Sequence, residues 1–69
     1  MKNKNQFIKD NEESLYYLFN LRESGVTNMF GAAAYLERDL GLNKKTAKEV
    51  LLFWMSNFKT VAEELGVEV

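Results

Sequence analysis

Three of the four glycines in this 69-residue chain are each followed by a branched apolar residue, and this repeated pair constrains the fold most. The pairs are Gly25 with Val26, Gly41 with Leu42, and Gly66 with Val67. A glycine in the left-handed conformation commonly ends a helix, and an apolar residue one place later packs back on the last turn. The pattern therefore predicts helices that end near residues 24, 40 and 65.

The stretch 23–36 joins the first two expected helices. Thr27 or Asn28 follows the first glycine stop, and either side chain can cap the next helix by accepting a backbone N–H. The small residues 31–34 then open that helix, which leaves room for another helix to cross closely. Alanine is also simply the best helix former, so Ala32 and Ala34 fit both interpretations.

The expected elements are three helices over residues 10–24, 28–40 and 44–65. Asp10 and Glu13 have the spacing of a capping box for the first helix, and Asn43 is placed to cap the third. The chain has no proline and no useful alternation of apolar and polar residues, so no strand is expected. We predict an all-α, compact three-helix domain over residues 10–69 with short glycine-containing turns, preceded by a flexible tail over 1–9.

The composition argues against most kinds of chemical site. The chain has no cysteine and no histidine, so the usual zinc sites are excluded, and no pair of carboxylates has a spacing that suggests catalysis. We therefore expect no enzyme activity, no cofactor and no small-molecule substrate. No apolar run approaches the roughly 20 residues that span a bilayer, so we expect a cytoplasmic protein without a membrane partner.

Two segments are apolar or aromatic all the way round, namely residues 15–19 and 51–55. A chain this short cannot bury two such helical segments by itself, so we expect a homo-oligomer, with a dimer as first guess, or a protein partner. The expected interface residues are Tyr16, Tyr17, Leu52, Phe53 and Met55. The alternative is that steeply crossing helices enclose more of the third helix than a parallel bundle would.

Basic residues gather in the first turns of the third expected helix, where the helix dipole disfavours them. The second and third helices, joined by a short turn, have the layout of a helix-turn-helix. A nucleic-acid-binding regulator is therefore a second hypothesis, with contacts from Lys44, Lys45, Thr46 and Lys48. Two alternatives stay open, which are a solvated surface and a phosphate or acidic protein ligand. The net charge of −1 argues against wrapping nucleic acid over the whole surface.

The residues 23–32, with Tyr35, Leu36, Ala47, Trp54 and Met55, carry a resemblance to a known family. Over about residues 15–58 the chain resembles a family of small uncharacterised proteins encoded mostly in bacteriophage genomes. That family has no assigned activity, so the resemblance implies a setting and no mechanism. Small phage proteins often act by binding another component, and the resemblance thus favours the interaction hypothesis.

Overall fold

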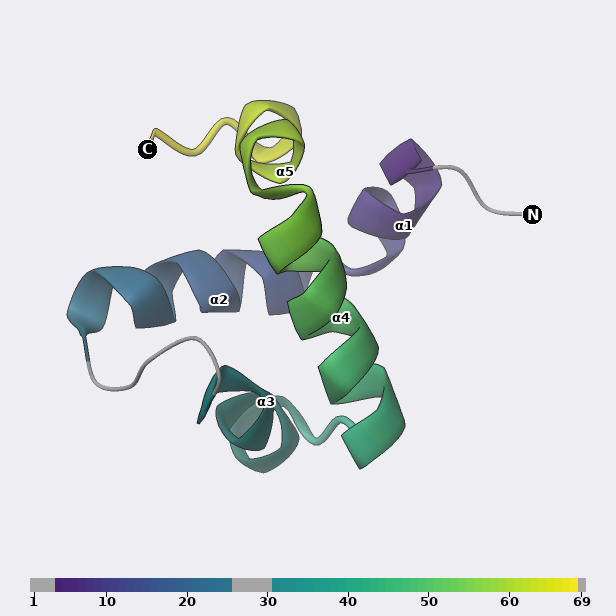
Figure 1. Ribbon diagram of the computed structural model, residues 1–69, viewed down its shortest axis with the longest axis vertical. Helices are drawn as coiled ribbons and strands as arrows, with labels where there is room; N and C mark the ends of the chain where they lie inside the picture. The colour runs from purple at the N-terminus through teal and green to yellow at the C-terminus, as the bar shows by residue number, and fades with distance from the viewer. Residues whose placement is uncertain (1–3, 26–30, 69) are drawn as a thin grey trace.

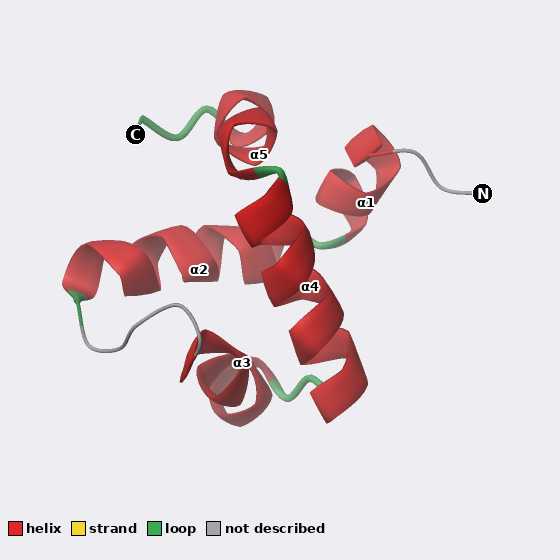
Figure 2. Ribbon diagram, in the orientation of Figure 1, coloured by secondary structure: helices red, strands yellow, loops and turns green. Residues whose placement is uncertain are grey.

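The computed structural model describes residues 4–25 and 31–68, and over these residues all regular structure is helical (Figure 2). The described helices are α1 (Lys4–Asp10), α2 (Glu12–Ser24), α3 (Ala32–Leu40), α4 (Lys44–Ser56) and α5 (Phe58–Leu65). The all-α prediction is confirmed. The three-helix prediction is wrong, because the first expected helix is preceded by α1 and the third is divided into α4 and α5. Residues 4–9, which were expected in a tail, lie in α1.

Two asparagines, Asn11 and Asn57, account for the extra helices. They adopt nearly the same backbone conformation, with φ/ψ of −123°/25° and −126°/30°. Each side-chain amide donates to the carbonyl four residues earlier, Asn11 to Phe7 at 2.9 Å and Asn57 to Phe53 at 3.1 Å. A side chain that bonds the local backbone competes with regular helix geometry. The chain therefore bends at each asparagine instead of continuing one helix.

The predicted glycine stops are confirmed. Gly25, Gly41 and Gly66 have φ values of 69°, 70° and 72°, in the left-handed region that a residue without Cβ adopts at least cost. After Gly66, the N–H of Val67 donates to the carbonyl of Ala62 at 2.9 Å, which is the bond expected when a helix closes on such a glycine. The predicted roles of Val26, Thr27 and Asn28 lie outside the described residues.

The predicted cap of the helix after Gly41 is also confirmed. The Asn43 side chain accepts a hydrogen bond from the backbone N–H of Thr46 at 2.7 Å, and α4 begins at Lys44. The predicted capping box at Asp10 and Glu13 is wrong, because α2 begins after Asn11, whose side chain makes no capping hydrogen bond to the described part of the chain.

Helix α4 crosses the middle of the molecule and packs against α2, α3 and α5 (Figure 1). Helix α1 lies on the other side of α4 from α3 and contacts α2 and α5. The molecule measures 27 × 27 × 17 Å, so along its shortest axis it is only about two packed helices thick. In so thin a molecule a helix is covered by neighbouring helices on some sides and exposed to solvent on others.

The core forms around α4, where α2, α3 and α5 pack against it. Its largest fully buried side chains are Leu15, Leu18, Leu36, Val50, Trp54 and Val61. The Trp54 ring meets Phe19 and Phe58 edge-on, with centroid separations of 5.3 and 5.1 Å, a geometry that aromatic pairs prefer. Among residues 4–25 and 31–68 the buried Trp54 indole N–H finds no hydrogen-bond partner, so the described contacts of this side chain are hydrophobic and aromatic.

The prediction that the last two helices form a helix-turn-helix-like unit is wrong. The helices joined by the turn 41–43 are α3 and α4, and α5 follows after the bend at Asn57. The last two helices are therefore α4 and α5. Asn57 joins them directly, in place of the short turn that was expected.

Candidate protein-binding face

The side of α4 that faces away from the core carries two well-exposed apolar side chains. Leu52 is 51% exposed and Met55 is 38% exposed, although both follow the buried Val50 within two turns. On a helix, residues three and four apart share a face, so Lys44, Lys48 and Met55 lie along one stripe with Leu52 at its edge. The stripe is basic at the start of α4 and apolar toward its end.

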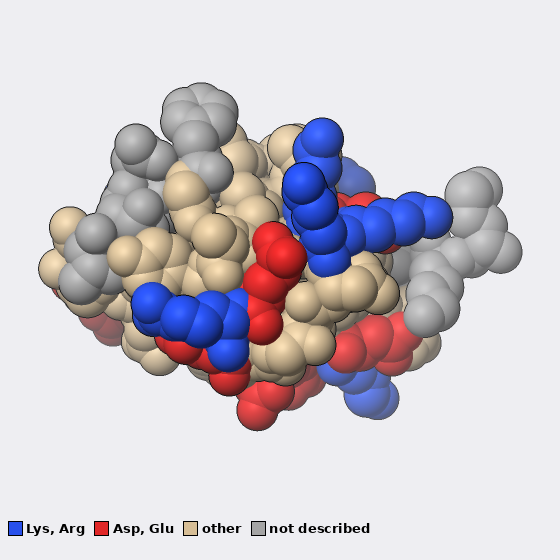
Figure 3. Space-filling view, turned by 90° about the horizontal axis from the view of Figure 1, so that it is seen from below, with Lys and Arg blue, Asp and Glu red and all other residues tan. Residues whose placement is uncertain are grey.

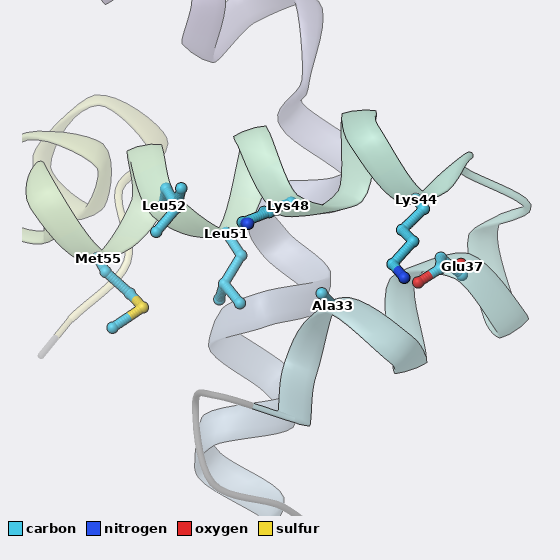
Figure 4. Close-up of a pocket in the computed structure, with 7 residues that line it drawn as sticks. All are labelled: Ala33, Glu37, Lys44, Lys48, Leu51, Leu52 and Met55. Carbon is cyan, nitrogen blue, oxygen red and sulfur yellow. The ribbon is translucent and has the colours of Figure 1, made fainter.

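This stripe borders a hollow of about 260 Å³ between α3 and α4, which we call the α3/α4 groove. Its lining residues are Ala33, Glu37, Lys44, Lys48, Leu51, Leu52 and Met55. Figure 4 shows Leu51 and Met55 extending from α4 on the side where Ala33 of α3 lies. The small Ala33 side chain leaves the hollow open at its apolar end.

The charged end of the groove carries Lys44 and Glu37, whose side chains extend toward one another in Figure 4. Glu37 is partly buried, whereas Lys44 and Lys48 are exposed. Within residues 4–25 and 31–68, neither lysine forms an ion pair. Both ammonium groups are therefore available to a ligand that enters the groove.

A second, shallower hollow of about 270 Å³ lies on the other side of Met55. It is lined by Arg22, Trp54, Met55 and Phe58. The Arg22 guanidinium sits over the Phe58 ring at 5.0 Å from the centroid, so a cation–π contact positions it there. Met55 thus separates two neighbouring hollows, one with lysines at its far end and one with an arginine.

Phe53 lies off the groove, although the sequence grouped it with Leu52 and Met55. It is partly buried, and its ring centroid lies 4.2 Å from that of Phe7. This contact joins α4 to α1. Phe53 therefore has an intramolecular role that the sequence did not indicate, because residues 1–9 were expected to lie outside the domain.

Tyr16 and Tyr17, the other predicted interface residues, also bond within the chain. Tyr16 is 41% exposed, but its hydroxyl donates to the carbonyl of Leu65 at 2.7 Å and satisfies an end carbonyl of α5. The Tyr17 hydroxyl donates to the Asp39 carboxylate of α3. The structure thus places both tyrosines as links between α2 and other helices, away from the α3/α4 groove.

The Asp39 carboxylate is the centre of a small surface cluster. Arg38 Nε donates to it at 2.8 Å, and the Arg38 guanidinium lies 4.7 Å from the centroid of the Tyr35 ring. The hydrogen bonds from Arg38 and then Tyr17 hold the pKa of the Asp39 carboxyl below its ordinary value. The bond to Asp39, followed by partial burial, raises the pKa of the Tyr17 phenol.

The predicted nucleic-acid contacts gather over the start of α4, where Figure 3 shows basic side chains grouped beside acidic ones. Lys44, Lys45 and Lys48 are exposed and Thr46 is partly buried. Only Lys44 and Lys48 line the α3/α4 groove. The sequence did not indicate that Arg22, Ala33, Glu37 and Leu51 belong to these hollows. The helical spacing of residues 44, 48, 51 and 55 was the signal that could have located the groove.

Among the described residues, no group of three or more acidic, histidine or cysteine side chains is arranged to hold a metal ion. None of the helices in the described ranges is long and apolar enough to cross a membrane.

Comparison with known proteins gives no match to a family model, to a curated protein or to a solved structure. The resemblance to phage-encoded proteins therefore stays a prediction.

Proposed function

We propose that this chain is a non-enzymatic protein-interaction module whose binding face is the α3/α4 groove. The observation that carries the proposal is that Leu52 and Met55, the exposed large apolar side chains of α4, border one apolar hollow. Contiguous exposed apolar surface commonly marks a binding site, and burying it against a partner is favourable. The binding mechanism is complementary shape and burial of this surface.

The partner in this proposal is another protein or a second copy of the chain, with a dimer as the simplest copy-based assembly. A 69-residue chain has a small core, so association would also add stability to the fold. A cytoplasmic location belongs to the same proposal.

The test compares tagged wild-type protein with the Leu52→Glu variant in the organism that encodes the chain. Proteins recovered with each form, including untagged copies of this chain, are quantified by mass spectrometry. A glutamate on the exposed apolar face costs little in folding but opposes burial against a partner. We expect at least one protein to be recovered with wild type and lost with Leu52→Glu.

The matched control is Asn5→Glu, which adds the same charge at an exposed position of α1. It should recover the same proteins as wild type, and circular dichroism should show equal helicity for all three forms. Identical recovery with Leu52→Glu and with wild type would contradict the proposal.

Nucleic-acid binding through the start of α4 is the second candidate function. It is favoured by three exposed lysines within five residues, Lys44, Lys45 and Lys48, on a helix whose start is held by the Asn43 cap. Replacing all three with glutamine should weaken binding to duplex DNA and flatten its dependence on salt concentration. Unchanged DNA affinity in that variant would remove this candidate.

A further inference from the structure

The α3/α4 groove and the hollow beyond Met55 share the Met55 side chain, and together they form a face with an apolar centre and cations at both ends. Lys44 and Lys48 line the groove on one side, and Arg22 lines the neighbouring hollow beyond Met55. Among the described residues, Glu37 is the single acidic residue that lines either hollow. The formal charge of these lining residues is three cations minus one anion, or +2, whereas the whole chain carries −1. The face is therefore basic on a weakly acidic protein.

This distribution argues against a second copy as the occupant. A two-fold axis pairs a face with itself, so each residue meets its symmetry equivalent or a residue from the opposite end. With the two α4 helices parallel, Lys48 would meet the lysines of the other copy. With the helices antiparallel, Lys48 would approach the other copy's Arg22. Both arrangements place cation against cation, and like charges across an interface disfavour binding.

The apolar centre argues equally against nucleic acid on this face. Phosphate groups need cations and hydrogen-bond donors, but the surface between the lysines and Arg22 is formed by Leu51, Leu52 and Met55. Glu37 would also repel a phosphate next to Lys44. The charges and the apolar surface together fit a ligand that is apolar in the middle and acidic at its ends.

We propose that the α3/α4 groove binds an acidic amphipathic helix of another protein. This inference rests on the proposed function and adds the chemical class of the partner. An amphipathic helix places its apolar side chains in a groove at spacings of three, four and seven residues. Leu52 and Met55 would contact those anchors, while carboxylates near the helix ends would pair with Lys48 and Arg22.

The dimensions of the face set the length of the bound helix. Lys44 and Met55 are eleven residues apart on α4, a rise of about 16 Å, which corresponds to roughly three helical turns. A partner helix of about twelve residues therefore covers the face from the lysines to the arginine.

The experiment uses two labelled helical peptides of that length with identical leucine positions. The first carries glutamates at its remaining surface positions, and the second carries glutamines in their place. Binding to the full chain is measured by fluorescence anisotropy and by the emission of Trp54, the single tryptophan, which borders the second hollow. A labelled DNA duplex is titrated in parallel.

Two pairs of protein variants accompany these ligands. The double variant Lys44→Gln/Lys48→Gln is matched by Lys4→Gln/Lys9→Gln, which removes the same charge from exposed positions of α1. Leu52→Glu is matched by Asn5→Glu. Circular dichroism confirms that each variant retains its helices.

We expect wild type to bind the acidic peptide about tenfold more tightly than the glutamine peptide, since several charge pairs of modest strength add up. Lys44→Gln/Lys48→Gln should lose about fivefold for the acidic peptide only, and the α1 control should lose nothing. Leu52→Glu should abolish the binding of both peptides.

Equal affinity for both peptides, with loss in Leu52→Glu, would overturn the acidic partner and leave the proposed function in place. Affinity that is unaffected by Leu52→Glu would overturn both. If the acidic peptide does not bind, the inference is overturned. It is also overturned if the DNA duplex binds more tightly than the acidic peptide and Lys44→Gln/Lys48→Gln loses that binding.

Discussion

The apolar runs 15–19 in α2 and 51–55 in α4 look alike in the sequence, but their surroundings in the fold differ. In α2, Leu15 and Leu18 are fully buried, and the tyrosines between them donate hydrogen bonds to α5 and α3. In α4, Leu51 and Trp54 are buried, but Leu52 and Met55 remain exposed beside a hollow.

The difference lies in the chemistry of the outward-facing residues. A tyrosine has an apolar ring and a polar hydroxyl, so it can lie on the surface and still bond to a neighbouring helix. Leucine and methionine have no polar group to use in this way. An all-round apolar run therefore suggests a binding face only where its outward residues lack a polar end.

Replacing a leucine by alanine should destabilise the fold far more in the run 15–19 than in the run 51–55. Leu18→Ala should lower the free energy of unfolding by about 2–5 kcal/mol, because it opens a cavity at a fully buried position. Leu52→Ala should cost less than about 1 kcal/mol, since half of that side chain is already exposed. Urea unfolding followed by circular dichroism measures both. Similar losses in the two variants would remove the distinction between the runs.

A second pair of variants sharpens the contrast within the run 51–55. Phe53→Ala should cost about 1–2 kcal/mol because it removes the contact with Phe7 that joins α4 to α1. Met55→Ala should cost less than about 1 kcal/mol. Hydrogen exchange should show faster exchange in α1 for Phe53→Ala alone. If α1 exchanges equally in both variants, Phe53 does not hold it.

A smaller loss of stability is expected when a tyrosine hydroxyl is removed from the run 15–19, where the hydroxyls bond to neighbouring helices of the same chain. Tyr16→Phe removes the hydrogen bond to Leu65 and should cost about 0.5 kcal/mol, the low end for an exposed bond. The midpoint of urea unfolding should fall slightly, with an unchanged slope. An unchanged midpoint would show that the hydroxyl bonds equally well to water.

The smallest effect is a pH dependence at Asp39 and Tyr17. The pKa of Asp39 is lowered in the fold, so its contribution to stability is present above its unfolded pKa and is lost as pH falls through the folded value. The pKa of Tyr17 is raised, so its contribution is present below its unfolded pKa and is lost as pH rises through the folded value. Unfolding midpoints across pH measure both losses.

The variant Tyr17→Phe isolates the alkaline loss, because it keeps the ring and removes the titrating hydroxyl. The difference in midpoint between wild type and this variant should shrink at alkaline pH. A constant difference from neutral to alkaline pH would contradict the assigned role of the Tyr17 hydroxyl.

The helix ends at the glycines could be predicted because their cause is local. A left-handed residue followed by an apolar one closes a helix in many contexts, and the Asn43 cap depends on residues only three positions apart. These signals located the ends of α2, α3 and α5 without knowledge of the tertiary fold.

The bends at Asn11 and Asn57 could not be predicted from the same local rules. Asparagine lowers helix propensity only modestly, and the apolar periodicity continues through Asn57 from Trp54 to Val61. Whether an asparagine bends a helix depends on how the segments on either side pack. Here the backbone carbonyls of Phe7 and Phe53 accept hydrogen bonds from the side-chain amides of the two asparagines. The rings of Phe7 and Phe53 pack against each other.

The candidate site was predictable in part. The sequence identified Leu52 and Met55 because the core could not cover every side of the run, and it identified Lys44 and Lys48 as unusually placed cations. It could not bring them together into one groove, since that depends on where α3 and the small Ala33 side chain lie. Arg22 comes from α2 and joins the face only through tertiary packing.

We propose that the run in α4 contacts another protein, whereas the outward residues of the run in α2 bond within the chain. The most direct test places a photo-crosslinking amino acid at position 52 or at position 16 in the organism that encodes the chain. We expect a covalent adduct with a different protein from position 52 and none from position 16. Adducts of equal mass and yield at both positions, or none at position 52, would contradict it.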